Sequence, residues 1–286
     1  MKFDNYGSKK MKTALHTDLF RKFSIEDAIP LIAQSGYEYI ELNAIPYWTP
    51  HVNLFDFDSE RKENLKKLLI QYNLKVIAIG TNTDLAILDR NERLRNVKYC
   101  IDAIKMSAEL GCHLVCTTFS GNVLLSFQKQ KQAFQESLIE ISKAGVEYNV
   151  ELAIELHPGS FIDSTLRAVN LLKSFDLPNV GYLFCFPHIA TFAGEDLIQA
   201  LKIAKDYTIH FHLADTPLCA NDHKHMMPES GEINFPKMIS EIKKSGFDDR
   251  YLTIEIYSED EHPLENAIKS KGLIDNLLNQ SNQVDR

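Results

Sequence analysis

The feature of this sequence that most constrains its fold is a unit repeated eight times, in which a short apolar run is followed by a loop and an amphipathic helix. Most of the runs are continuously apolar rather than alternating, which is typical of strands buried on both faces of a parallel sheet. Because consecutive parallel strands need right-handed crossover helices, eight such units predict an α/β fold, a single closed (β/α)8 TIM barrel. The predicted strands cover residues 13–16, 39–42, 76–79, 114–117, 152–156, 180–185, 209–213 and 252–256.

Helix signals separate the predicted strands. Residues 24–27 have the form of a capping box, and Gly36 predicts the end of the helix that it begins. The other helices are expected around residues 65–72, 97–108, 134–146, 165–175, 196–207, 235–245 and 264–278. The alternative fold, an open doubly wound sheet, usually has a glycine-rich turn after its first strand, and residues 15–18 contain no glycine.

Length and charge narrow the class of protein further. A chain of 286 residues suggests about two domains on length alone, but no Pro/Gly/Ser-rich linker divides it. We therefore expect one barrel domain over residues 12–282, after an irregular or disordered leader at residues 1–11. The chain has 31 Lys plus Arg against 39 Asp plus Glu, a net charge of −8. This balance argues against non-specific binding of nucleic acid and against adhesion to anionic membranes.

The cysteines and the first residues bear on the compartment. The sequence contains no apolar stretch of membrane-spanning length, and its polar first ten residues do not form a signal peptide. The cysteines are odd in number and show no CxxC spacing, so we expect reduced thiols and a cytoplasmic protein. The five cysteines are Cys100, Cys112, Cys116, Cys185 and Cys219.

Candidate site residues stand at the ends of the last four predicted strands. In a barrel the carboxyl ends of the strands form the active mouth, so these residues should converge. Two carboxylates with an imidazole are a typical divalent-metal constellation. Because alternate residues of a strand share a face, His210 and His212 point the same way, and His212 is nearer the mouth. The candidates are Glu155, Cys185 or His188, His210 or His212, and Glu255.

Taken singly, each candidate has a plain structural interpretation. A buried glutamate can be the partner of an ion pair, and a buried histidine or cysteine can be a satisfied core residue. Their joint occurrence on four consecutive strands, at the end where a barrel has its site, favours a functional centre.

From Met11 onward the chain resembles the xylose isomerase-like barrel superfamily, the sugar phosphate isomerase/epimerase group. The order and spacing of several short segments carry the resemblance, which is specific for the superfamily but not for one substrate. These segments are residues 108–111, 152–159 (LAIELHPG), 180–188, 210–216 (HFHLADT), 231–235 (GEINF) and 253–255.

The resemblance implies one divalent metal ion, which is Mn, Mg, Co or Zn in that family. Its ligands would be Glu155, Cys185, His212 and Glu255. The family has an aspartate in an Asp-x-x-His motif where this chain has Cys185. A thiolate suits Zn or Co better than Mg or Mn. Three outcomes stay open: a softer metal held by Cys185, a metal held by the other three residues with water, or loss of the metal.

The implied reaction is the isomerisation or epimerisation of a ketose or a related sugar or polyol. The metal would stabilise an enediolate, while Glu155 and Glu255 remove a proton next to the carbonyl and return it. His157 and His188 would bind substrate hydroxyls or shuttle a proton, or they only brace the strand ends. His16 and Glu41 are weaker candidates of the same kind.

The loop after the seventh predicted strand is long and sits at the expected mouth. Lys224, between His223 and His225, could bind a phosphate or carboxylate of the substrate, or belong to a solvated polar loop. The small-molecule substrate is the main expected partner, and the family also implies a homodimer or homotetramer.

Two other functions are compatible with the same residues. A dehydratase, such as an inosose or 3-dehydroshikimate dehydratase, begins with the same proton abstraction, and residues 155–158 (ELHP) are similar to the equivalent strand of 3-dehydroshikimate dehydratases. Alternatively, Cys185 indicates a degenerate barrel that binds a sugar without turnover. A nuclease of the related endonuclease type fits less well, because it needs more histidine and aspartate ligands.

Overall fold

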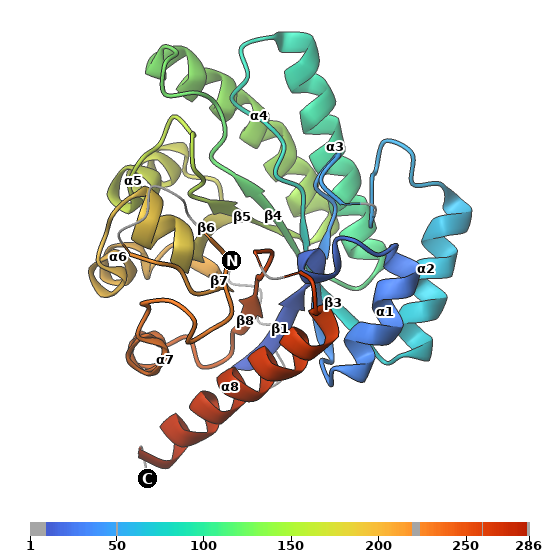
Figure 1. Ribbon diagram of the computed structural model, residues 1–286. Helices are drawn as coiled ribbons and strands as arrows, with labels where there is room; N and C mark the ends of the chain where they lie inside the picture. The colour runs from blue at the N-terminus through green and yellow to red at the C-terminus, as the bar shows by residue number, and fades with distance from the viewer. Residues whose placement is uncertain (1–9, 50, 219–223, 259, 285–286) are drawn as a thin grey trace.

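The computed structural model describes residues 10–49, 51–218, 224–258 and 260–284. Eight parallel strands close into a barrel in sequence order, and β8 pairs with β1 to complete it (Figure 1). This confirms the predicted single (β/α)8 TIM barrel. The strands are β1 (Lys12–His16), β2 (Tyr39–Asn43), β3 (Lys75–Gly80), β4 (Leu114–Thr118), β5 (Glu151–Glu155), β6 (Val180–Cys185), β7 (Thr208–Leu213) and β8 (Tyr251–Ile254).

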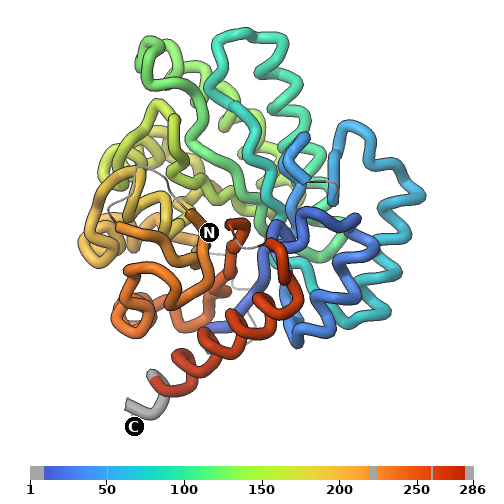
Figure 2. The backbone as a smooth tube through the Cα atoms, viewed as in Figure 1, coloured from blue at the N-terminus to red at the C-terminus, as the bar shows by residue number. Residues whose placement is uncertain are grey.

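The helices form a ring outside the strands, and the chain colour passes around this ring in sequence order (Figure 2). A 3-10 helix, η1 (Thr17–Phe20), follows β1, and a π-helical turn, η2 (His188–Phe192), follows β6. The α-helices are α1 (Ile25–Gln34), α2 (Ser59–Gln71), α3 (Arg90–Glu109), α4 (Phe127–Tyr148), α5 (Thr165–Phe175), α6 (Leu197–Ala204), α7 (Phe235–Lys244) and α8 (Pro263–Val284).

The capping box at the start of α1 is present. The Ser24 hydroxyl accepts a hydrogen bond from the backbone N–H of Asp27, and Gly36 follows the helix with a φ of +87°, a backbone conformation that glycine adopts without strain. Helices α2 and α3 begin earlier than their apolar spacing predicts. Their first turns are polar and carry no apolar periodicity, and Asp58 and Asp89 cap them.

The apolar core is divided by the barrel wall. A large cluster fills the space between the strands and the surrounding helices. A small second cluster lines the inside of the barrel with mostly short side chains, which leaves interior volume for polar groups near the mouth. Its members are Ala14, Ile77, Ala78, Leu114, Cys116, Ala153, Leu183 and Cys185.

Two further expectations concern the ends of the chain and the membrane. The predicted leader falls almost wholly on residues 1–9, which lie outside the described residues, so it stays a prediction. Among the helices that the structure describes, none combines the length and the apolar character that a bilayer span requires.

Candidate metal centre and active site

Four predicted metal ligands meet at the carboxyl end of the barrel. Glu155 and Cys185 are the last residues of β5 and β6, His212 is the last but one of β7, and Glu255 directly follows β8. All four side chains are buried, and one donor atom from each lies within 4.8 Å of the others. The closed barrel therefore brings together residues that are 100 positions apart in sequence (from 155 to 255).

The donor atoms converge on one point. The Nδ1 atom of His212 lies 3.3 Å from Oε1 of Glu155 and 3.1 Å from Oε2 of Glu255. These three atoms are buried, and none of them forms a hydrogen bond with the described residues. A single proton on Nδ1 could satisfy one carboxylate oxygen but not both, whereas a divalent cation between the atoms would satisfy all three. The donor set therefore fits a metal ion.

The charges at this point are balanced by histidine. Burial alone would raise the pKa of Glu155 and of Glu255. The adjacent His188 and His212 nevertheless hold the pKa of Glu155 well below its usual range. His212 and His225 do the same for the pKa of Glu255. Burial acts to lower the pKa of His212, yet Glu255 and Glu41 raise it well above its usual value. The positive charge that the carboxylates require can be supplied by a protonated imidazole, or by a divalent ion that displaces this proton.

Cys185 faces the same point with a different chemistry. Burial, reinforced by the charge of Glu155, raises the pKa of the Cys185 thiol well above its usual value. The side chain is fully buried, so the thiol is neutral unless a cation binds beside it and withdraws the proton. Its presence within 4.8 Å of the other three donors is compatible with a ligand role, which stays a prediction.

Two histidines cover the centre from the side of the loops. The Nδ1 atom of His188 lies 3.2 Å from Oε1 of Glu155, and that of His225 lies 2.9 Å from Oε2 of Glu255. The two rings meet at Nε2, 3.2 Å apart. His225 also stacks on Tyr257, with ring centroids 4.4 Å apart. The sequence named His188 as a candidate but suggested only a cationic loop around His225, and the approach of His225 to Glu255 is seen only in the structure.

The remaining predicted residues lie at different distances from the centre. The ring of His157 packs edge-on against His188 with centroids 4.9 Å apart, and burial together with the charge of His188 lowers the pKa of His157. His16 is buried at the end of β1, with its ring centroid 5.6 Å from that of His212. Lys224 is exposed, and its backbone N–H donates to the Thr216 hydroxyl. His223, expected beside Lys224, lies outside the described residues.

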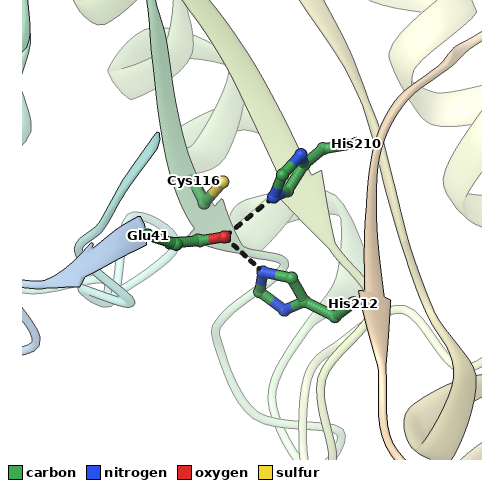
Figure 3. Close-up of side chains that lie close together, drawn as sticks. All are labelled: Glu41, Cys116, His210 and His212. Atoms are coloured by element: carbon green, nitrogen blue, oxygen red, sulfur yellow. Dashed lines mark hydrogen bonds and ion pairs between the residues drawn. The ribbon is translucent and has the colours of Figure 1, made fainter. Parts of the chain in front are cut away.

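A second set of donors lies next to the first and shares His212 with it. It consists of Glu41, Cys116, His210 and His212, and we call it the floor cluster. Glu41 has no exposed surface, and one of its oxygens contacts both histidines (Figure 3). Burial would raise the pKa of Glu41, but His212 and His210 hold it well below its usual range. The sequence ranked Glu41 as a weak candidate and gave no reason to single out Cys116.

An aromatic wall at the mouth was not anticipated. The indole N–H of Trp48 donates to both carboxylate oxygens of Asp18, at 2.9 Å each. The Trp48 ring meets Tyr257 edge-on, so the wall continues to His225. Burial raises the pKa of Asp18 despite the opposing charge of His16. Asp18 lies in η1, and Trp48 and Tyr257 lie in the loops after β2 and β8, and the sequence carries no spacing that joins them.

The sequence matches a known family over most of its length. The family described as "Xylose isomerase-like TIM barrel" matches residues 29–277. The chain belongs to this family. The resemblance inferred from the strand-end motifs is thereby confirmed.

Individual relatives are distant. A curated 3-dehydroshikimate dehydratase from Bacillus anthracis is 21% identical over 266 residues, covering 86% of this chain and 90% of that protein. Among solved structures, a D-tagatose 3-epimerase-like protein superposes with a TM-score of 0.81 at 19% identity, covering 96% of this chain and all of the other. The IolI protein, solved with a bound zinc atom, gives a TM-score of 0.76 at 18% identity and covers 95% of this chain and 99% of the other.

These relatives share a barrel that is used by enzymes acting on small molecules. At such identities the structural matches establish the fold, and they fit either an isomerase or epimerase or a dehydratase. The choice between these reactions, and the metal, depend on the residues of this chain.

Proposed function

We propose that the protein is a divalent-metal-dependent isomerase or epimerase that acts on a ketose or a related sugar or polyol. The observation that carries this proposal is the convergence of Glu155 Oε1, His212 Nδ1 and Glu255 Oε2, all buried and without a hydrogen bond among the described residues. Buried carboxylates that face one another across an imidazole are costly unless a cation holds them together.

Glu155, Cys185, His212 and Glu255 would hold the ion. When bound, it would act as a Lewis acid toward a carbonyl and a neighbouring hydroxyl of the substrate. The thiol among the ligands favours Zn or Co.

The two carboxylates supply the proton chemistry. One of them takes the proton from the carbon next to the carbonyl, and the electron pair of the broken C–H bond forms the enediolate. The other, carrying a proton, returns one to the neighbouring carbon or to the opposite face of the same carbon. Glu155 and Glu255 come from different strand ends and both approach Nδ1 of His212, so each can reach a substrate bound at this point. His188 and His157 would orient substrate hydroxyls.

The test uses a panel of free and phosphorylated ketopentoses and ketohexoses in D2O, with the enzyme loaded with Zn, Co or Mn. An isomerase or epimerase incorporates deuterium at the carbon that exchanges its proton. Glu155→Gln and Glu255→Gln are expected to lower turnover by at least about 100-fold, the usual contribution of a general acid or base, with no loss of fold. Full activity in both variants would contradict the proposal.

A dehydratase is the second candidate. It is favoured by the relative from Bacillus anthracis, which covers 86% of this chain, and by residues 155–158, which resemble the equivalent strand of such enzymes. After the same proton abstraction, a hydroxyl on the next carbon leaves as water. Incubation with 3-dehydroshikimate separates the candidates, because dehydration creates an unsaturated product that absorbs in the ultraviolet, whereas epimerisation does not.

A further inference from the structure

The floor cluster lies one layer deeper in the barrel than the metal centre and shares His212 with it. Its four side chains are at most 3% exposed. Glu41 comes from β2 and the two histidines from β7, strands that are not neighbours in the barrel, so the cluster spans the interior (Figure 3). Burial of a carboxylate in such a place costs free energy unless opposite charges and hydrogen bonds pair it fully.

The two nitrogens of His212 differ in their surroundings. Nδ1 faces the two carboxylates of the metal centre and forms no hydrogen bond with the described residues. Nε2 forms a hydrogen bond with Oε2 of Glu41 at 3.0 Å. An ionised carboxylate can only accept, so the proton of a neutral His212 ring lies on Nε2. The lone pair of Nδ1 then points at Glu155 and Glu255.

We infer that Glu41 is a positioning residue, which fixes His212 in the Nε2–H tautomer and so presents Nδ1 to the cation. The inference rests on the proposed metal centre. Metal-binding histidines generally donate their second ring N–H to an oxygen, which orients the ring and increases its basicity. Here that oxygen belongs to Glu41.

The other members of the layer hold Glu41 in place. The same Oε2 atom lies 2.8 Å from Nε2 of His210, and this nitrogen also lies 3.1 Å from the hydroxyl of Thr253 on β8. Glu41 is therefore linked to two strands that carry site residues. It contacts β7 through both histidines, and it is linked to β8 because His210 contacts Thr253. A shift of Glu41 would move His212 relative to Glu255.

A second metal ion in the floor cluster is the competing interpretation, because four donor types suitable for zinc are present there. Simultaneous occupation of both places would remove both protons of the His212 ring and leave a bridging imidazolate. In the floor cluster Oε2 of Glu41 is paired with both histidines and only Oε1 lacks a hydrogen bond among the described residues, whereas at the metal centre a donor atom of Glu155, of His212 and of Glu255 each lacks one. One ion per chain is therefore expected.

The test uses the full-length protein stripped of metal and titrated with zinc by calorimetry. Wild type should bind one equivalent. Glu41→Gln keeps the shape of the side chain but removes its charge, and it should weaken zinc binding by about 10- to 100-fold. Cys100→Ala removes a buried thiol outside both donor clusters, so it is the control and should bind zinc as wild type does, while Cys116→Ala tests for a second ion. Circular dichroism checks that each variant is folded.

The tautomer is measured directly in wild type, by long-range 1H–15N correlation spectra of the zinc-loaded protein with labelled histidine, assigned with the His210→Gln variant. A proton on Nε2 of His212 is expected. A proton on Nδ1 would overturn the inference even if Glu41→Gln does not fold. Unchanged zinc affinity in a folded Glu41→Gln variant would also overturn the inference. So would the binding of two equivalents of zinc by wild type and of only one by Cys116→Ala. Absence of zinc binding by wild type would instead refute the metal centre itself, and with it the proposed function.

Discussion

At the scale of single residues, the centre combines predictable and unpredictable parts. Glu155 and Glu255 were recognised because a carboxylate inside an apolar strand is costly without a partner. His212 was preferred to His210 because it lies nearer the mouth, and the structure places it beside both carboxylates. His225 was not given a place in the centre, because it reaches the centre from a loop whose path the sequence does not show, and Asp18, in η1 directly after β1, was not singled out.

The metal preference of the site should depend on Cys185. Cys185→Asp replaces a soft ligand by a hard one, so the preference of the site should move from Zn and Co toward Mn and Mg. The measurement is a competition titration of the metal-stripped protein with these ions. Cys116→Asp would place a carboxylate one layer deeper, outside the proposed ligand set, and should not produce the same shift. An unchanged preference in Cys185→Asp would show that Cys185 is not a ligand.

At the scale of elements, the order of strands and helices was predictable, while the first turn of α3 and the connecting loops were not. The apolar period locates the buried middle of α3, but its beginning at Arg90 depends on the cap by Asp89. The loop after β2 is held by His51, whose Nδ1 lies 3.1 Å from the Thr17 hydroxyl and whose Nε2 lies 3.1 Å from the carbonyl oxygen of Phe20. This loop brings Trp48 to the mouth, where it donates to Asp18.

His51 makes stability depend on pH. Its burial lowers the pKa of the ring to about 4, from a usual value of 6.5. Between these two values the unfolded chain binds a proton that the folded protein does not, so the stability that His51 contributes is complete above pH 6.5 and is lost as the pH falls to about 4. The loss amounts to about 3 kcal/mol for a shift of this size.

The measurement is the free energy of unfolding by urea at pH values between 4 and 7, in wild type and in His51→Gln. The variant is less stable at pH 7, because it removes a buried ring with two hydrogen bonds. Its stability should nevertheless fall less steeply with decreasing pH. Parallel pH profiles for the two proteins would contradict the assignment of this dependence to His51.

At the scale of the whole molecule, closure of the barrel brings together the residues of the proposed centre, Glu155, His212 and Glu255, from separate strands. A homodimer or homotetramer, as implied by the family, stays a prediction. A ligand that binds only the folded state stabilises it, so metal should stabilise the entire barrel. At a free zinc concentration about 100 times the dissociation constant, the gain is about 2.7 kcal/mol.

Thermal unfolding of the metal-stripped protein checks this expectation. Zinc or cobalt should raise the midpoint temperature of wild type, and the increase should disappear in a Glu155→Gln, Glu255→Gln double variant. If Zn, Co and Mn all leave the midpoint temperature unchanged, the alternative of a non-catalytic sugar-binding barrel is favoured. That alternative was suggested by Cys185, which stands where the family has an aspartate.

The sequence by itself predicted the barrel, because eight buried apolar runs alternate with amphipathic helices and no glycine-rich turn of a doubly wound sheet follows the first run. It also singled out the main candidate donors, because strand-end carboxylates and imidazoles need no knowledge of distant contacts to be noticed. Only the tertiary structure decided which nitrogen of His212 faces the ligands, that Glu41 contacts the other one from the far side of the barrel, and that His225 approaches Glu255. The physical reason is that hydrogen bonds and ligand geometry depend on distances of a few ångströms between segments that lie from 30 to 171 residues apart in the chain.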